Sequence, residues 1–414
     1  MQRAQHFATG DTEMATKAKP IAQVALGLEP GPFHDRLVAH NRQQSWVNWM
    51  GYASPSVLDN VEFEYFAIRN QSTLFDISPM CKYAITGPDA ETVVNRLVTR
   101  DIRKLKPGRV AYCIWCDEDG NVVDDGTVFR LSETEFRLCC QEPQLSWLED
   151  IAWGFDVSIS DVTRDIAGLA LQGPTSCALL KDLGLAGIET LKTFGIAGFE
   201  IAGAAVTISR TGFTGDLGYE LWMRPADAPK VWDALMDAGK LRGLRVIGYE
   251  ALEMARIEAG FLLPKVDFLS AQTVLRADRA NTPYELGLEW LVALDKPHFN
   301  GRRALVDLSK QTPRRKLVAI EIERDKPAHN ALVYHRKTRE VGMVTSALWS
   351  PTCKRNIAYA WLDAPYGQSF TDDLWVEIYL QKEIRWQRRM VRCKLVDKPF
   401  FAHPRRTATP PADH

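Results

Sequence analysis

The sequence predicts an α+β protein in which two related α+β halves precede a C-terminal β-barrel domain. A pattern of strand, Gly-Pro turn and helix occurs twice, ending in the segments 86–97 and 172–183, and strand-like segments follow each copy. Towards the C-terminus the pattern changes to short strands separated by turn residues. The expected boundaries are a leader at 1–30, halves at 31–160 and 161–312, a barrel at 313–402 and a tail at 403–414.

The first half opens with a helix and continues with a β-rich segment. An amphipathic pattern predicts a helix that ends near Asn70. A strand then runs into the first Gly-Pro turn, and Asp89 stands near the N-cap of the next helix. Residues 108–141 read as three strands, because Asp117–Gly120 and Leu131–Thr134 supply turn residues between apolar runs.

The second half repeats this order and then adds helices. Residues 199–223 read as a set of strands, and apolar spacing predicts helices over 226–239 and 248–262. The polar leader and the polar, proline-containing tail are both expected to be disordered.

Composition excludes several classes of protein. The 414 residues include 51 basic and 52 acidic side chains, and this balance argues against a binder of nucleic acid or of anionic membranes. No apolar run approaches the roughly 18 residues of a membrane span, and no secretory signal is visible. The eight cysteines are therefore expected to be reduced in a cytoplasmic protein. We expect the Cys113–Cys116 pair and the adjacent Cys139 and Cys140 to be core residues, because no second CxxC or histidine pair accompanies them.

One short stretch raises a question about function. Ser209–Met223 reads SRTGFTGDLGYELWM, with closely spaced glycines and a single carboxylate, Glu220, inside an apolar strand-like run. The glycines indicate a connection whose backbone approaches another group closely. Glu220 could point to solvent from an edge strand, or it could be a buried acceptor for two parallel N–H donors.

This stretch resembles the signature of the glycine-cleavage aminomethyltransferase family, the T-protein fold. Further segments match the family in the same order, so that the resemblance covers roughly residues 33 to 400: LFDISPMCKYAITGPDA, LALQGP, RIEAG, NTPYELGLEWLVALDKPHFNGRRAL and VGMVTSALWSPTCKRNIAYAWL. The resemblance implies tetrahydrofolate as cofactor and transfer of a one-carbon group.

The resemblance also assigns roles to individual residues. The family has a glutamate that holds the pterin ring of tetrahydrofolate, and Glu220 matches it. The second aspartate of an acidic pair lies at the reacting folate nitrogen and corresponds to Asp125, while Asp124 points to the other face of its strand. Arg256 matches an arginine that contacts folate. Phe213 replaces a family tyrosine, which implies packing against the cofactor without a hydrogen bond.

The acidic pair and the arginine also have purely structural explanations. Asp124, Asp125 and Gly126 could close a hairpin, since Asp-Gly is a common turn dipeptide. Arg256 could pair with Glu253 or Glu258 on the surface of its helix. No metal site is expected, because His329 and His335 are too few ligands.

The nature of the donor separates the members of the family. Pro79 replaces a family histidine, and Trp49, Tyr52 and Trp115 are candidates for binding the methyl donor. Aromatic rings can surround a sulfonium or ammonium group, or they can stack on a methoxy-arene. The alternative is plain core packing. We favour a tetrahydrofolate-dependent demethylase, similar to dimethylsulfoniopropionate demethylase, that acts on a small methylated onium or amine.

Other functions and partners stay open. The alternatives are glycine-cleavage aminomethyl transfer from a lipoyl carrier protein, O-demethylation of a methoxy-aromatic, and a non-enzymatic folate-binding accessory role. The accessory proteins of the family carry a Lys-Gly-Cys-Tyr segment that this chain lacks. The related flavin-linked dehydrogenases require an N-terminal GxGxxG domain, so a flavoprotein could act only as a separate partner. A homodimer also stays open.

Overall fold

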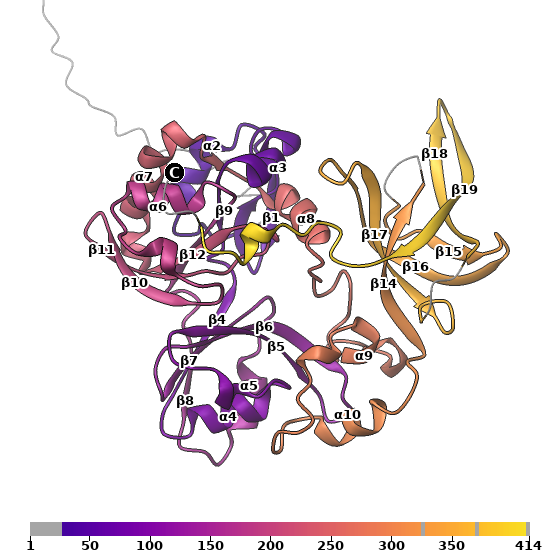
Figure 1. Ribbon diagram of the computed structural model, residues 1–414, viewed down its shortest axis with the longest axis horizontal. Helices are drawn as coiled ribbons and strands as arrows, with labels where there is room; N and C mark the ends of the chain where they lie inside the picture. Colours follow the sequence, from indigo (N-terminus) through magenta and orange to yellow (C-terminus); the bar gives the residue numbers. More distant parts are fainter. Residues whose placement is uncertain (1–26, 324–327, 369–371, 411–414) are drawn as a thin grey trace, which may run out of the picture.

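The computed structural model describes residues 27–323, 328–368 and 372–410. Three lobes surround the centre of the molecule: two α+β lobes and a barrel (Figure 1). The fold class predicted from the sequence, an α+β region followed by a C-terminal β-barrel, is confirmed. Most of the predicted leader, residues 1–26, lies outside the described residues.

The lower lobe in Figure 1 is built on an antiparallel sheet with the strand order β5-β6-β7-β4-β8. The three strands predicted over 108–141 are β5, β6 and β7, and the predicted turns separate them. The elements of this lobe are β4 (Cys81–Thr86), α4 (Ala90–Leu97), β5 (Arg109–Cys116), β6 (Val122–Arg130), β7 (Glu135–Cys140), α5 (Leu145–Ala152) and β8 (Ser158–Asp161).

The second lobe holds a sheet with the order β10-β11-β12-β9-β3-β13. Its strands are β3 (Thr73–Asp76), β9 (Ala167–Gln172), β10 (Ile196–Ile201), β11 (Ala204–Ser209), β12 (Gly218–Met223) and β13 (Arg245–Val246). Its other elements are α2 (His34–His40), the hairpin of β1 (Trp46–Trp49) and β2 (Tyr52–Pro55), α3 (Val61–Asn70), α6 (Ser176–Asp182), α7 (Ala228–Gly239) and α8 (Tyr249–Glu258). Strand β3 precedes the lower lobe in the sequence but pairs with β9. The second lobe therefore contains residues from both sides of the lower lobe in the chain.

The two Gly-Pro turns have the same backbone geometry and the same reason for glycine. Gly87 and Gly173 have φ angles of 135° and 121°, which favour glycine. A Cβ atom at Gly87 would lie 2.7 Å from the carbonyl oxygen of Asp156, and one at Gly173 would lie 2.4 Å from that of Gln71. The repeat seen in the sequence is therefore a repeated tight passage from strand to helix.

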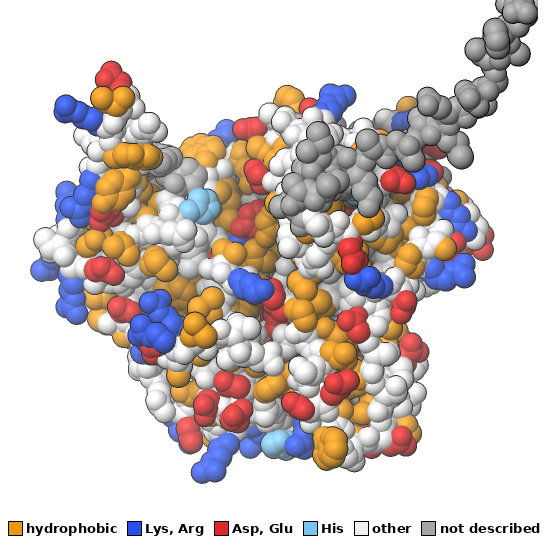
Figure 2. Space-filling view, turned by 180° about the vertical axis from the view of Figure 1, so that it is seen from behind, with side chains coloured by type: hydrophobic (Ala, Val, Ile, Leu, Met, Phe, Trp, Pro, Cys, Tyr) orange, Lys and Arg blue, Asp and Glu red, His pale blue; other side chains and the backbone are white. Residues whose placement is uncertain are grey.

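The barrel is closed, with the strand order β14-β17-β16-β15-β18-β19. Its strands are β14 (Arg315–Ile322), β15 (Leu332–His335), β16 (Arg339–Ser350), β17 (Arg355–Asp363), β18 (Leu374–Lys382) and β19 (Arg385–Val396). The short helices α9 (Pro283–Leu286) and α10 (Arg302–Leu308) precede it. The hairpin of β18 and β19 projects beyond the barrel and exposes Ile384 and Trp386 (Figures 1 and 2).

The C-terminal segment corrects one prediction. After β19 the chain leaves the barrel and returns to the second lobe (Figure 1). Arg210 donates to the carbonyl oxygen of Ala408 at 2.5 Å, and Thr193 donates to that of Thr407 at 3.4 Å. The prediction of a disordered tail is therefore wrong for residues 403–410, because arginine side chains bind the tail to the second lobe.

The cysteine prediction is confirmed. Cys113, Cys116, Cys139 and Cys140 are all buried, and none is in a disulfide. Among the described residues, no helix is long and apolar enough to cross a membrane.

Candidate functional site

A cavity of about 1030 Å³ lies between the two sheets, α8 and the segments that flank the barrel. Both sheets contribute carboxylates to its wall, Asp125 from β6 and Glu220 from β12. Arg256 of α8 and Arg406 of the C-terminal segment also line it. The fold thus brings together residues that lie up to 281 positions apart, from 125 to 406.

Asp125 is held by a tyrosine on the neighbouring strand. Its cross-strand partner is Ile114, and Tyr112, two residues earlier, is the diagonal neighbour on the same face. The Tyr112 hydroxyl donates a hydrogen bond of 2.6 Å to Oδ2 of Asp125. Burial raises the pKa of Asp125 to about 6, although the hydrogen bond from Tyr112 opposes this rise.

The side chain of Asp124 lies on the opposite face of the same strand. Its Oδ2 accepts hydrogen bonds from the backbone N–H of Glu142 and the side chain of Gln144, at 3.4 and 3.3 Å. Both aspartates lie within β6, while the hairpin turn is at Asp117–Gly120. The alternative that Asp124–Gly126 closes a hairpin is therefore wrong.

Glu220 sits on β12 between Ser209 of β11 and Ala170 of β9. The Thr211 hydroxyl donates to Oε2 of Glu220 at 2.6 Å, and the hydroxyls of Ser209 and Thr211 are 2.7 Å apart. Burial raises the pKa of Glu220 to about 7, against the hydrogen bond from Thr211. Glu220 therefore occupies a central strand and faces the cavity, unlike a solvent-facing side chain on an edge strand.

The glycines of the loop before β12 make room for Gln172. A Cβ atom at Gly212 or Gly218 would lie 2.0 or 2.3 Å from Oε1 of this side chain. The Gln172 amide donates to the carbonyl oxygens of Thr211 and Tyr219, and its oxygen accepts from Thr214 at 3.0 Å. The close approach predicted from the glycines is thus to a side chain of β9.

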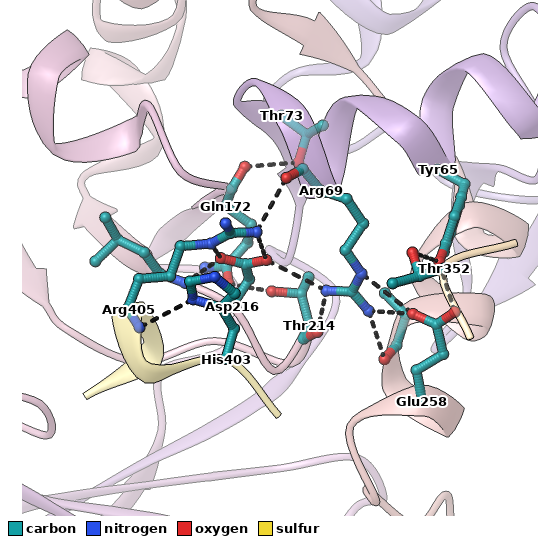
Figure 3. A network of polar contacts seen from close by, with 12 residues as sticks. Tyr65, Arg69, Thr73, Gln172, Thr214, Asp216, Glu258, Thr352, His403 and Arg405 are labelled. Atoms are coloured by element: carbon teal, nitrogen blue, oxygen red, sulfur yellow. Dashed lines mark hydrogen bonds and ion pairs between the residues drawn. The ribbon is translucent and has the colours of Figure 1, made fainter. Parts of the chain in front are cut away.

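A buried polar network fixes the same loop to the C-terminal segment (Figure 3). Arg405 forms two parallel hydrogen bonds to Asp216, at 2.5 and 2.8 Å. Arg69 of α3 lies on the other side, 3.6 Å from Asp216, and pairs with Glu258 at 2.5 Å. Arg69 also donates to the carbonyl oxygen of Thr214 at 2.8 Å. Asp216 is therefore clamped between two arginines from distant parts of the chain.

Phe213 forms part of an aromatic layer in the cavity wall. Its ring stacks on that of Phe261, with centroids 5.1 Å apart and planes inclined by 12°. The guanidinium of Arg406 lies 5.0 Å from the centroid of Phe261. All three residues line the cavity, and the packing of Phe213 against the cofactor stays a prediction.

Arg256 is committed to contacts within the protein. Its side chain is fully buried and donates to Glu253 at 2.9 Å, Asp267 at 2.5 Å and Ser346 of the barrel at 2.8 Å. The pairing with Glu253 is the alternative considered from the sequence, whereas Glu258 pairs with Arg69. Arg256 therefore connects α8 to the barrel through Ser346 and also lines the cavity, and its expected contact with folate stays a prediction.

The three aromatic candidates for donor binding have different surroundings. Trp49 lines the cavity and stacks on Phe75, with ring centroids 5.7 Å apart. Trp115 is fully buried in the core of the lower lobe, and Tyr52 is half-buried beside Gly31. Neither lines the cavity, so the structure supports plain packing for these two and keeps Trp49 at the site.

Several residues of the site were missed from the sequence. Tyr112, Thr211 and the Arg69–Asp216–Arg405 network carry no motif of their own. The predicted turn at Asp117–Gly120 could not have identified Tyr112, because a β-bulge between Trp115 and Cys116 shifts the register of β5 on β6 by one residue. Within the described residues, no group of three His, Cys, Asp or Glu side chains could hold a metal ion.

The pocket fits a reduced folate by its chemistry. A buried carboxylate suits the parallel N–H donors of an aminopyrimidine ring, and stacked aromatic rings suit a flat heterocycle. Glu220 and the Phe213–Phe261 layer supply both within one cavity.

Comparison with known proteins agrees with this geometry. Residues 33–296 match the GCVT N-terminal domain, and residues 315–402 match the glycine cleavage T-protein C-terminal barrel domain. The aminomethyltransferase of Alkaliphilus metalliredigens is 32% identical over 362 residues, covering 86% of this chain and 93% of the relative. That of Listeria welshimeri is 33% identical over 362 residues, with the same coverage.

A solved structure shows the same fold. The glycine cleavage system aminomethyltransferase T from Bartonella henselae superposes with a TM-score of 0.78 and 24% sequence identity. The match covers 90% of this chain and 98% of the other. The chain therefore belongs to the glycine cleavage T-protein, or aminomethyltransferase, family, and is an enzyme of tetrahydrofolate-dependent one-carbon transfer.

Proposed function

We propose that this enzyme is a demethylase that moves a methyl group from a small methylated onium or amine to tetrahydrofolate. The observation that carries the proposal is the wall of the cavity that holds Asp125 and Glu220. Trp49 and Phe75 form a stacked aromatic pair in this same wall. The face of an indole ring attracts a desolvated cation by about 0.5–2 kcal/mol.

The two carboxylates of the cavity have different roles towards the folate. Glu220, aligned by Thr211, accepts the N–H donors of the pterin ring. Asp125, oriented by Tyr112, would stand beside the reacting nitrogen and would accept or relay a proton there. Bound tetrahydrofolate supplies N5, the atom that takes up the one-carbon group.

The proton balance depends on the donor. A sulfonium, quaternary ammonium or protonated amine donor leaves as a neutral thioether or neutral amine once its methyl bond breaks, and the N–H proton of the acceptor nitrogen must depart. With a pKa of about 6, Asp125 is mostly ionised at neutral pH and can take that proton. Holding donor and acceptor in line in one cavity supplies most of the remaining acceleration.

The names of the relatives favour a second candidate. The curated relatives reported above are called aminomethyltransferase, and the match covers 93% of their length. Under this alternative the donor is an aminomethyl group on a lipoyl carrier protein, and ammonia is released. O-demethylation of a methoxy-aromatic is a third donor chemistry that the Trp49–Phe75 pair could accommodate.

The deciding experiment is an assay of donors with the purified full chain and tetrahydrofolate. The donors are dimethylsulfoniopropionate, betaines, methylated glycines, methoxybenzoates and an aminomethylated lipoyl carrier, and folate products are separated by chromatography. We expect 5-methyl-tetrahydrofolate from an onium or amine donor, and a Trp49→Leu variant should raise KM for it. Trp153→Leu, which changes an exposed tryptophan, is the matched control.

Two results would overturn the proposal. Turnover confined to the lipoyl carrier would establish the aminomethyl reaction. Turnover of methoxybenzoates alone would establish the aromatic donor.

A further inference from the structure

A buried arginine outside the expected site lies behind the wall that carries Glu220. Arg137 of β7 is only 5% exposed and is the cross-strand partner of Phe129 on β6. Its guanidinium carbon lies 4.9 Å from the ring centroid of Phe129 and 5.3 Å from that of Trp222. Trp222 belongs to β12 of the other sheet, so Arg137 lies where the two lobes meet.

The charge of Arg137 is not balanced by an ion pair. Among the described residues its guanidinium pairs with no carboxylate, and its buried Nε has no hydrogen-bond partner. A buried, unpaired charge is expensive, and two aromatic faces compensate only part of the cost. The other buried arginine in the neighbouring strand, Arg130, pairs with both Glu91 and Glu133. The charge of Arg137 is therefore available to act through space on a nearby carboxylate.

The carboxylate of Glu220 stands on the same strand as Trp222, one of the two rings that hold Arg137. Trp222 follows Glu220 by two residues, so both side chains share one face of β12. The Trp222 indole donates to Ser209 at 3.3 Å, and the hydroxyls of Ser209 and Thr211 continue this chain to Glu220. The positive charge of Arg137 lowers the pKa of Glu220, against the dominant effect of burial.

We propose that Arg137 is a positioning residue for folate: from between Phe129 and Trp222, its buried charge keeps Glu220 ionised and able to accept the pterin N–H donors. The proposal rests on the proposed role of Glu220 in binding folate. A protonated carboxyl group keeps only one oxygen as a full acceptor. Its O–H proton would then face the N–H donors of the pterin ring. The other groups that interact with Glu220 are the hydroxyls of Ser209 and Thr211 and the thiol of Cys139, while Lys82 interacts electrostatically with Arg137 and with Asp76.

The first test measures the ionisation of Glu220 without folate. In the full chain labelled with ¹³C at glutamate carboxyls, the Glu220 signal is assigned by its loss in Glu220→Gln and followed from pH 5 to 9. We expect a midpoint near pH 7. Arg137→Gln should raise this midpoint by about one pH unit, and Arg137→Lys, which keeps the charge, should shift it less.

The second test measures binding of 5-formyl-tetrahydrofolate by calorimetry over the same pH range. Arg137→Gln should weaken binding about fivefold at pH 7, because the ionised fraction of Glu220 falls from about one half to about one tenth, and it should recover towards the wild-type affinity near pH 9. Arg130→Gln removes a buried arginine of the same sheet that stacks on Phe136, and it should leave the midpoint unchanged. A general loss of packing would lower affinity equally at every pH.

The outcomes separate the two proposals. An unchanged Glu220 midpoint in Arg137→Gln, or a loss of affinity that is equal at all pH values, would overturn the role of Arg137. Absence of folate binding by the wild type, or full affinity in Glu220→Gln, would instead overturn the role of Glu220, while the carboxyl titration would still report on Arg137.

Discussion

The two carboxylates of the cavity come from different lobes, Asp125 from β6 between β5 and β7 and Glu220 from β12 between β11 and β9, and they have different surroundings. Asp125 receives one hydrogen bond from Tyr112, a neighbour on its own sheet. Glu220 receives one from Thr211, in a chain of hydroxyls that leads back to Trp222, with the charge of Arg137 behind it. Burial raises the pKa of both, to about 6 and about 7.

The comparison teaches how one cavity can give two acids different tasks. A pKa near 6 leaves Asp125 ionised at neutral pH yet basic enough to take a proton, as a group that acts on a reacting nitrogen requires. In the role that we propose, Glu220 holds the pterin ring, and its affinity for N–H donors depends on its being ionised. The predictions below separate these two roles.

The largest expected effect is on turnover. Asp125→Asn keeps the shape and the partner Tyr112 but removes the proton acceptor, so kcat should fall by roughly 10²–10⁴-fold. Folate affinity, measured by calorimetry, should change little. A variant with normal kcat would show that Asp125 takes no part in proton transfer.

The second effect is on folate affinity. Glu220→Gln replaces a charged acceptor by a neutral amide that can donate as well as accept, and about 1.5–3 kcal/mol of binding should be lost. Titration with 5-formyl-tetrahydrofolate measures the loss. Glu200→Gln, on the edge strand β10, is the matched control. If both variants bind equally well, Glu220 does not hold the pterin ring.

The third prediction concerns stability and pH. The folded pKa values of Asp125 and Glu220 lie above the ordinary values of 3.8 and 4.5. The folded state therefore binds more protons than the unfolded state between about pH 4 and 7, and the free energy of unfolding falls as pH rises through this window. Asp125→Asn removes a rise of about two pKa units, so it should raise the free energy of unfolding at pH 8 by about 3 kcal/mol. Urea unfolding at pH 5 and pH 8 checks this. The gain in the free energy of unfolding should be much larger at pH 8 than at pH 5.

The smallest effect is expected from the clamp on the glycine-rich loop. Arg405→Gln removes the paired hydrogen bonds to Asp216, which Arg69 still neutralises, so folate affinity should fall only about three- to tenfold. Arg385→Gln, on the projecting hairpin, is a control that should bind folate normally. Equal affinities would mean that the loop keeps its position without the C-terminal segment.

Local patterns predicted the elements of this fold well. The helix that ends at Asn70, the strands β5 to β7 and both Gly-Pro turns were all visible, because turn residues and apolar spacing act over a few positions. The tail was mispredicted, because what binds residues 403–410 is a set of partners such as Arg210 and Asp216, about 190 positions away. The composition of a chain end gives no information about contacts with such distant residues.

The aromatic candidates show the same limit. Trp49 and Trp115 look alike in the sequence, yet one lines the cavity and the other fills the core of the lower lobe. Which face of a strand meets a cavity depends on the packing of two sheets, and this information is not local.

By itself, the sequence determined the order of elements, the family resemblance and the identity of the two carboxylates, because these depend on short motifs. Only the tertiary structure decided what surrounds each acid. It placed Tyr112 against Asp125, set Arg137 between Phe129 and Trp222, and clamped Asp216 between Arg69 and Arg405. The physical reason is that burial and charge act through space, and the groups that shift a pKa or hold a loop come from strands far apart along the chain.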